Sequence, residues 1–252
     1  MTKFSFNLQK KESAEFYDEF GYVVYKDIAD KKIIQTMKET INQILKLQTK
    51  KSNLGDNFKF SNGFDNGMME LSEKNDLLRK RFYEISPTIW EVHSLATQPI
   101  YREVAVNLGI SLPMLGNCQI RMDLPGDERF LLPPHQELRG MKSPNMISFI
   151  TALCDINPEN GALSLAPGSH KLGILKQELL VEKNYHYVPE KFYKGKYDFV
   201  QASLKEGESV LIHPCIIHAS CANVSKKIRW SHVARFEDSL NMPFLLGGEV
   251  FL

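Results

Sequence analysis

The sequence predicts a mainly β fold, a double-stranded β-helix (a cupin-like jelly roll), with a helical buttress on its N-terminal side. Apolar residues recur at helical spacing through most of residues 1–115, whereas short alternating segments separated by turn residues fill residues 116–236. Neither a repeat nor an interdomain linker interrupts the 252 residues. We therefore expect one domain over 1–252, in which the first part supports the core and the second part carries the site.

Helices are expected to dominate the first part. Residues 12–20 have the pattern of a short amphipathic helix, and Gly21 should end it, because glycine readily adopts the left-handed conformation that follows a helix. A strand is expected at residues 23–25. A longer helix should then begin after Asp30, whose carboxylate can cap the first turn.

The stretch 50–67 is polar and rich in Asn, Gly and Lys, so we expect a loop that is long enough to act as a substrate lid. Residues 74–109 return to helical spacing. Proline cannot continue a regular helix, and we therefore expect interruptions at Pro87 and Pro99.

Five further segments have the alternation or the apolar content of strands, and turn dipeptides separate them. These segments are residues 118–124, 146–153, 162–166, 208–212 and 228–236. Residues 176–197 form a long insertion of mixed polarity, which we expect to be a flap over the mouth of the barrel. Trp90 and Trp230 are expected in the hydrophobic core.

Composition limits the class of function. A formal net charge of +1 argues against binding to nucleic acid or to an anionic membrane, because both require an excess of basic residues. No apolar run is long enough to span a bilayer, and the first residues contain no signal-peptide core. The four cysteines lack the CxxC spacing of zinc and redox sites. We expect a cytoplasmic protein that acts on a small molecule, and nothing in the sequence indicates its oligomeric state.

A possible metal site is formed by His135, Glu137 and His218. His135 and Glu137 are separated by one residue, so both side chains point to the same face of an extended strand. Two imidazoles and one carboxylate are the ligands that hold iron(II) on one face and leave positions open for oxygen chemistry. Because a lone His-x-Glu triplet also arises by chance, the prediction depends on the distant His218 and on the residues that follow it.

Arginine residues near this motif could bind anions. Arg229 and Ser231 share one face of a predicted strand, which places a guanidinium fork beside a hydroxyl group. The fork can bind the carboxylate of an acidic cosubstrate in bidentate fashion. The alternative for Arg229 is an ordinary surface salt bridge. Arg121 and Arg139 either bind an anionic group of the substrate or lie on the solvated surface.

Several motifs resemble those of the phytanoyl-CoA dioxygenase family of iron(II)- and 2-oxoglutarate-dependent oxygenases. Asn160-Gly161-Ala162-Leu163 followed by Pro167-Gly168-Ser169-His170-Lys171 resembles the family's NGxL…PGSHK segment. Residues 207–210 before His218-Ala219-Ser220 resemble its GD…HxS segment, with Glu208 in place of Asp, and residues 20–24 resemble its opening turn. The resemblance is dense from about residue 117 to residue 236. We expect His170 to be a structural residue.

The resemblance implies an oxidoreductase that uses iron(II), 2-oxoglutarate and dioxygen to hydroxylate an unactivated C–H bond. It implies three catalytic metal ligands, which are His135, Glu137 and His218. It also implies a set of residues that bind 2-oxoglutarate, which are Arg229, Ser231, Ser220 and Gln119. The substrate would be a small biosynthetic metabolite, a sugar or glycan precursor, or an acyl compound.

One position departs from the family pattern. The family has Asp where this chain has Glu137, whose side chain is one methylene longer. A glutamate can still ligate iron through a carboxylate oxygen, so we expect a serviceable but altered site. Two alternatives stay open: a jelly-roll binding module that has lost turnover, and the same iron site used for desaturation or epimerisation.

Overall fold

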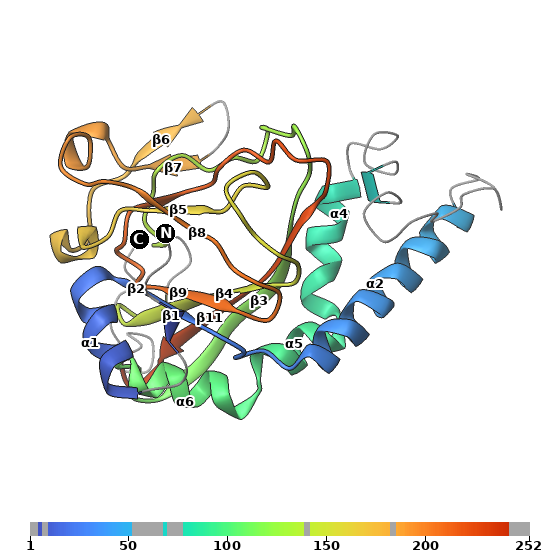
Figure 1. The fold of residues 1–252 in the computed structure, drawn as a ribbon, viewed down its shortest axis with the longest axis horizontal. Coiled ribbons are helices and arrows are strands. Elements are labelled where there is room, and N and C mark those ends of the chain that lie inside the picture. Colours follow the sequence, from blue (N-terminus) through green and yellow to red (C-terminus); the bar gives the residue numbers. More distant parts are fainter. Residues whose placement is uncertain are drawn as a thin grey trace.

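The computed structural model describes residues 5–6, 10–51, 68–69, 78–138, 142–181 and 185–241. Two stacked sheets, a separate two-stranded hairpin and a layer of helices make up this part of the chain, with the three-stranded sheet above the six-stranded one in Figure 1. The predicted jelly roll with helical support is confirmed. Nearly all of the lid predicted at residues 50–67 lies outside the described residues.

The first elements follow the prediction. Helix α1 (Lys10–Phe20) ends at Gly21, which has φ of +76°, and strand β2 (Tyr22–Tyr25) begins directly after it. Helix α2 (Lys31–Lys51) is capped as expected, because Oδ1 of Asp30 accepts a hydrogen bond from the backbone N–H of Lys32 at 2.7 Å. A two-residue strand that we did not predict, β1 (Ser5–Phe6), pairs with β2.

The later helices break where proline predicts. Helix α4 (Leu78–Ile85) gives way to a 3₁₀ turn (Ser86–Thr88) that contains Pro87, and α5 (Trp90–Ala96) is separated from α6 (Pro99–Asn107) by the second proline. The expectation for Trp90 is wrong: its side chain is 82% exposed, because it opens α5 on the side away from the sheet, while Val92 and Leu95 face inward.

The larger sheet has the strand order β1-β2-β9-β4-β11-β3, and the smaller sheet has the order β10-β5-β8. All pairs except β1–β2 are antiparallel. The larger sheet contains β3 (Pro113–Asp123), β4 (Met146–Ala152), β9 (Ser209–Ile212) and β11 (Arg229–Asp238). The smaller sheet contains β5 (Leu163–Leu165), β8 (Val200–Ala202) and β10 (His218–Ala219). The sequence predicted all of these strands except β8 and β10.

The insertion at residues 176–197 forms a hairpin of β6 (Glu178–Leu180) and β7 (Tyr185–Tyr187), followed by a 3₁₀ turn (Glu190–Phe192). Two further 3₁₀ turns cover Ser169–Leu172 and Ser239–Asn241. The hairpin contacts the segment of the predicted ligands, because the N–H of Val188 donates to the carbonyl of Pro134 at 2.7 Å.

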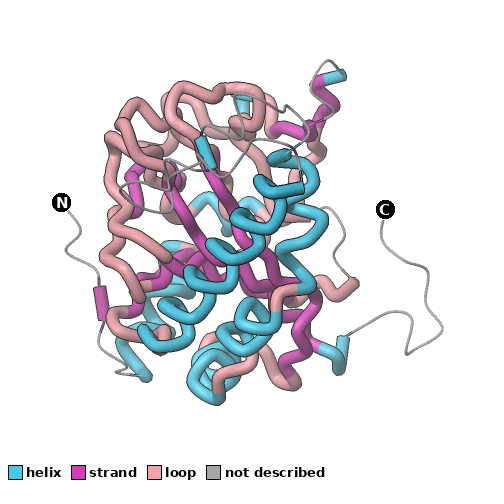
Figure 2. The backbone as a smooth tube through the Cα atoms, turned by 90° about the vertical axis from the view of Figure 1, so that its right-hand side faces the viewer, coloured by secondary structure: helices cyan, strands magenta, loops and turns pink. Residues whose placement is uncertain are grey.

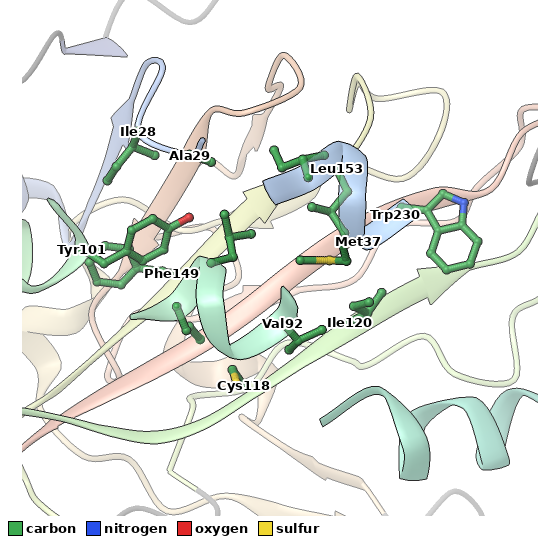
Figure 3. Close-up of a cluster of buried hydrophobic side chains, with 14 of the residues drawn as sticks. Ile28, Ala29, Met37, Val92, Tyr101, Cys118, Ile120, Phe149, Leu153 and Trp230 are labelled. Atoms are coloured by element: carbon green, nitrogen blue, oxygen red, sulfur yellow. The ribbon is translucent and has the colours of Figure 1, made fainter. Parts of the chain in front are cut away.

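One face of the larger sheet packs against the helices, which lie in front of the strands in Figure 2. Residues at alternate positions of β2, β3, β4 and β11 contribute to this buried cluster, as alternation along a strand predicts. Figure 3 shows Tyr101 of α6 beside Phe149 of β4, and their ring centroids are 5.0 Å apart. Replacing Phe149 by Ala would cost about 3–5 kcal/mol, as is typical of a fully buried aromatic side chain.

The opposite face of the same sheet is apolar on some strands and polar on others. On β2, β9 and β4 it is apolar and packs against β5 and β8 of the smaller sheet in a second cluster. On β11 and β3 it carries charged and polar residues at alternate positions, of which Arg229, Ser231 and Arg235 lie on β11. The interior between the sheets is therefore filled by hydrocarbon at one side and lined by polar groups at the other.

Candidate metal centre

The two predicted histidine ligands lie opposite each other across a single pair of backbone hydrogen bonds. The N–H of His135 donates to the carbonyl of His218 at 2.9 Å, and the N–H of His218 donates to that of His135 at 3.0 Å. Residues paired in this way have their side chains on the same face. The imidazole centroids are consequently 4.2 Å apart, although His135 belongs to no regular strand.

Each imidazole is oriented by its own backbone neighbourhood. Nδ1 of His135 lies 2.8 Å from the carbonyl of Pro133, and Nδ1 of His218 lies 3.0 Å from the carbonyl of Ile216. A carbonyl oxygen can only accept, so Nδ1 carries the proton in both rings and Nε2 keeps its lone pair. This is the orientation that a metal-binding histidine needs.

Glu137 completes the set. One potential ligand atom from each of His135, Glu137 and His218 lies within 4.8 Å of the others. The N–H of Glu137 donates to the carbonyl of Pro214 at 2.9 Å, which holds its backbone beside the chain that leads to His218. Its carboxylate forms an ion pair with Arg235 of β11, with 3.1 Å between Oε2 and Nη2.

The protonation states suit a cation. Burial lowers the pKa of both imidazoles, that of His218 to about 3 with a further contribution from His135, so both rings are neutral. Burial alone would raise the pKa of Glu137, but the positive charge of Arg235, the largest opposing cause, helps to lower that pKa to about 2. Two neutral nitrogen donors and one carboxylate are thus present without any proton having to leave.

Gln136 fixes the segment between the two ligands from the other side. Its amide nitrogen donates to the carbonyls of Gly173 and Cys215 at 2.8 and 2.7 Å, and its amide oxygen accepts from the N–H of Leu175 at 2.8 Å. The side chain is buried, so these bonds are shielded from water. Gln136 points away from the metal ligands, as alternation predicts, and ties them to the loop before the β6–β7 hairpin.

The PGSHK turn anchors the strand of His218. Oγ of Ser169 accepts from the N–H of Ile217 at 2.8 Å, and the His170 ring bonds the carbonyl of Asp18 at 2.9 Å through Nε2. A Cβ at Gly21 would lie 2.4 Å from Nδ1 of His170, so only glycine fits between them. His170 is therefore structural, as expected, and joins α1 to the metal-binding strand.

A cluster of charged residues lies further along the same face of β3 and β11. Asp123 and Arg229 are register partners and form a buried ion pair through Oδ2 and Nη2. Nε of Arg121 lies 3.0 Å from the same carboxylate oxygen, and Nη2 of Arg121 donates to Oγ of Ser220 at 3.0 Å. Burial would raise the pKa of Asp123, but Arg121 and Arg229 lower it far below its usual range.

Two polar atoms of this cluster are buried and find no partner among the described residues. They are Nε of Arg229 and Oγ of Ser231. Leaving a buried donor unsatisfied costs about 1–3 kcal/mol, more for a charged group. Asp123 compensates only one of the two guanidinium charges of Arg121 and Arg229. A carboxylate ligand would supply both the missing acceptor and the missing negative charge.

A cavity of about 250 Å³ adjoins this cluster. Gln119 and Arg121 contribute its polar wall, and its other lining residues are Tyr83, Phe130, Leu132 and Tyr185. The hydroxyl of Tyr83 is already bonded to the backbone of Met122 at 2.8 and 3.2 Å, so this residue presents its ring to the cavity. Tyr185 comes from the predicted flap, which thus borders the site.

The sequence of this chain matches the phytanoyl-CoA dioxygenase (PhyH) family over residues 17–231. The chain belongs to this family. Curated relatives include a phytanoyl-CoA dioxygenase of Arabidopsis thaliana, 23% identical over 88% of this chain and 86% of that protein. The peroxisomal phytanoyl-CoA dioxygenase of Mus musculus is 25% identical over 92% of this chain and 70% of that protein. The predicted family and the predicted dioxygenase activity are confirmed.

Solved structures share the fold of this PhyH-family chain. EctD from S. alaskensis, a structure with 2-oxoglutarate and 5-hydroxyectoine, gives a TM-score of 0.64 at 16% identity over 92% of this chain and 77% of the other. The α-ketoglutarate-dependent epimerase SnoN from nogalamycin biosynthesis gives 0.61 at 17% identity over 91% and 83%. The carbocyclase SnoK from the same biosynthesis gives 0.60 at 17% identity over 91% and 84%.

The predicted residues of the PhyH-family site fall into two groups. The structure brings His135, Glu137 and His218 together. It also joins Arg121 to Ser220 and, through Asp123, to Arg229, while Ser231 shares the face of Arg229 on β11 and Gln119 lines the adjoining cavity with Arg121. Arg139 lies outside the described residues. Arg229 is not in a surface salt bridge, because its side chain is 4% exposed. Among the described residues no helix is both long and apolar enough to cross a membrane.

Three residues of the site were missed. Asp123 and Arg235 carry a signal in the sequence, because each shares the alternating face of a strand with a residue that was predicted, Arg121 and Ser231 respectively. For Gln136 the sequence gives no signal of a structural role other than its position between two predicted ligands. Only the cross-strand register shows which of these charges face each other.

Proposed function

We propose that this protein is an iron(II)- and 2-oxoglutarate-dependent dioxygenase that hydroxylates a C–H bond of a small molecule. The observation that supports this proposal most strongly is the triad of His135, Glu137 and His218. Their potential ligand atoms lie within 4.8 Å of one another, and Nε2 of both histidines has a free lone pair. Iron(II) favours two imidazoles and one carboxylate, and Mg²⁺ or Ca²⁺ would favour an all-oxygen set. The donor set therefore fits iron.

The residues of the chain divide the work. His135, Glu137 and His218 hold the metal on one face, and Arg229 with Ser231 binds the far carboxylate of 2-oxoglutarate. Bound iron(II) supplies the activation of dioxygen, coupled to conversion of 2-oxoglutarate to succinate and carbon dioxide. Ser220 orients Arg121, and Gln119 lines the cavity that adjoins the cluster of Arg121, Asp123 and Arg229.

The orphaned Nε of Arg229 and Oγ of Ser231 support the assignment of the cosubstrate. Both atoms lie on the face of β11 that looks into the barrel, and both need an acceptor or donor that the described residues do not offer. If Arg229 formed an ordinary surface salt bridge, water would solvate both atoms, and they would need no partner from a ligand. A dicarboxylate that reaches from the metal to Arg229 satisfies them.

The substrate is proposed to be a small metabolite. The cavity of about 250 Å³ lies just below the range of about 300–1,000 Å³ that is typical of ligand pockets, and the rings of Tyr83, Phe130 and Tyr185 border it. Such a lining suits a compact molecule with an apolar surface and a polar group near Arg121. A sugar or glycan precursor fits the same description, and so does a short acyl compound.

An anaerobic titration tests the proposal. Iron(II) and 2-oxoglutarate added to the metal-free protein should produce a weak visible charge-transfer band, and dioxygen should then release succinate. His218→Ala should abolish both signals, because the variant lacks one nitrogen ligand. His186→Ala is the matched control, since His186 is exposed on β7. A His218→Ala variant that released succinate at the parent's rate would disprove the metal assignment.

The kind of oxidation that the enzyme carries out requires a separate measurement. Two structural neighbours are an epimerase and a carbocyclase, so one fold of this type serves outcomes other than hydroxylation. Mass spectrometry of the product decides: hydroxylation adds one oxygen atom, desaturation or ring closure removes two hydrogen atoms, and epimerisation leaves the mass unchanged. A jelly-roll binding module would bind 2-oxoglutarate without releasing succinate.

A further inference from the structure

Arg235 contacts the carboxylate ligand directly. Its Nη2 lies 3.1 Å from Oε2 of Glu137, and its Nη1 donates to Oδ1 of Asn117 at 2.9 Å. Arg235 and Asn117 are register partners on β11 and β3. The guanidinium group is thus fixed at one end by a neighbouring strand and at the other end by the predicted metal ligand.

The environment of this pair differs from that of a surface ion pair. The side chains of Arg235 and Glu137 are each 19% exposed, and Nε of Arg235 is buried. Arg235 follows Arg229, Ser231 and Val233 at alternate positions on β11, so it points into the barrel. An interaction between partly buried charges is screened less by water and salt than one on the surface.

We infer that Arg235 is a positioning residue for Glu137, and this inference rests on the proposed function. The guanidinium group holds Oε2, so that Oε1 is left for the metal and Glu137 acts as a single-oxygen ligand. Glutamate has one more rotatable bond than aspartate, and each free rotor costs conformational entropy when a ligand is ordered. Arg235 orders the longer arm before the metal arrives. This contact lets glutamate serve where the family has aspartate.

A purely structural role for Arg235 makes a different prediction. In that case replacing it would lower the stability of the fold and leave metal affinity unchanged in the protein that remains folded. The two roles are separated by measuring the affinity for a metal and the melting temperature on the same variants. Residues that orient a metal ligand typically contribute 10–100-fold to metal affinity.

The probe is cobalt(II). It prefers ligands similar to those of iron(II) but does not activate dioxygen as iron(II) does. Metal-free wild type, Arg235→Met and Arg235→Lys are titrated with cobalt(II) by calorimetry, and folding is monitored by circular dichroism. Arg102→Met is the control, because Arg102 lies exposed on α6. Arg235→Met should raise the Kd for cobalt(II) by about 10–100-fold. Arg235→Lys should raise it less, and the control should leave it unchanged.

A double variant shows whether Arg235 acts through Glu137. Glu137→Ala weakens binding by removing the ligand, and adding Arg235→Met should then cause no further loss. Equal affinity of Arg235→Met and wild type, or losses that add in the double variant, would overturn the inference. If Arg235→Met does not fold, Asn117→Ala keeps every charge and should still weaken cobalt(II) binding several-fold; unchanged affinity there would overturn it as well. Wild type that binds no cobalt(II) would refute the proposed function itself.

Discussion

Arg229 and Asp123 face each other across β11 and β3 and form an ion pair that water does not reach, with side chains only 4% and 6% exposed. Asp123 is also bound by Arg121, so one carboxylate serves two guanidinium groups. A buried charge without compensation is costly, and the cluster keeps one positive charge in excess. In the proposed function, an anionic ligand between Arg229 and Ser231 balances the charge that the described residues leave in excess, and this ligand is the far carboxylate of 2-oxoglutarate.

Arg229→Met should weaken binding of 2-oxoglutarate without weakening binding of the metal. A hydrogen bond to a charged group is worth about 1.5–3 kcal/mol, which corresponds to roughly a 10–100-fold increase in Kd. The anaerobic visible band, titrated with 2-oxoglutarate, measures the first quantity, and cobalt(II) calorimetry measures the second. Ser231→Ala should have a smaller effect in the same direction. Unchanged affinity for 2-oxoglutarate would assign Arg229 a structural role only.

Asp123→Asn should destabilise the protein and make that stability depend more strongly on 2-oxoglutarate. The substitution leaves the buried guanidinium group of Arg229 and the partly buried one of Arg121 without their shared carboxylate, which costs about 3–5 kcal/mol. An anionic ligand then restores part of the loss, because a ligand that binds only the folded state stabilises it. Thermal denaturation with and without 2-oxoglutarate and metal measures both the loss of stability and the part of it that the ligand restores.

The control for Asp123→Asn is Glu19→Gln. Glu19 pairs with Lys171 at 2.7 Å on the surface, with side chains 61% and 51% exposed. Removing an exposed ion pair of this kind costs less than about 1 kcal/mol. A loss in Asp123→Asn as small as that in Glu19→Gln would show that Asp123 is not needed to balance Arg121 and Arg229.

Much of the fold was predictable because single residues next to each helix determine where that helix begins or ends. Pro87 lies in the 3₁₀ turn between α4 and α5, and Pro99 begins α6. Gly21 ends α1, and Asp30 caps α2 through its side chain. The longer strands show alternation because one face packs against helices and the other looks into the barrel. Strands β8 and β10 were missed, since three and two residues are too short to show a period.

The metal ligands were predictable from their order and not from strand propensity. His135 lies in an isolated bridge and His218 in a two-residue strand, so neither has a periodic pattern around it. The Asp123–Arg229 pair depends on the register of β3 against β11, which a single sequence does not contain. The Glu137–Arg235 pair joins a segment outside the sheets to β11, and the sequence does not show this contact either. Propensity also fails for Trp90, whose exposure depends on the side of α5 it occupies.

Glu137→Asp should weaken metal binding even though aspartate is the residue of the family. The shorter side chain cannot reach the metal and keep the 3.1 Å contact with Arg235 from the same backbone position. Cobalt(II) calorimetry should show an increase in Kd of about tenfold, and succinate release should fall with it. Glu84→Asp, on the exposed side of α4, is the matched control. Metal binding as tight as in wild type would mean that the backbone adjusts to either acid.

Stability should fall between pH 6.5 and pH 4 in part through His232, which is remote from the metal ligands. Its ring is fully buried, Nε2 bonds the carbonyl of Val92 at 3.0 Å, and burial lowers its pKa to about 4. The folded pKa lies below the unfolded value of about 6.5, so in this interval the unfolded state binds more protons. The stabilisation is complete above pH 6.5 and is lost as the pH falls towards 4.

His232→Gln should remove this dependence, because an amide can still donate to the carbonyl of Val92 and does not titrate. Denaturant unfolding of the metal-free protein at several pH values measures the slope. Wild type should lose up to about 3 kcal/mol more than the variant across the interval, since each pKa unit corresponds to about 1.4 kcal/mol. His186→Gln, at an exposed position on β7, should behave as wild type. Parallel curves for wild type and His232→Gln would show that His232 takes up its proton equally in both states.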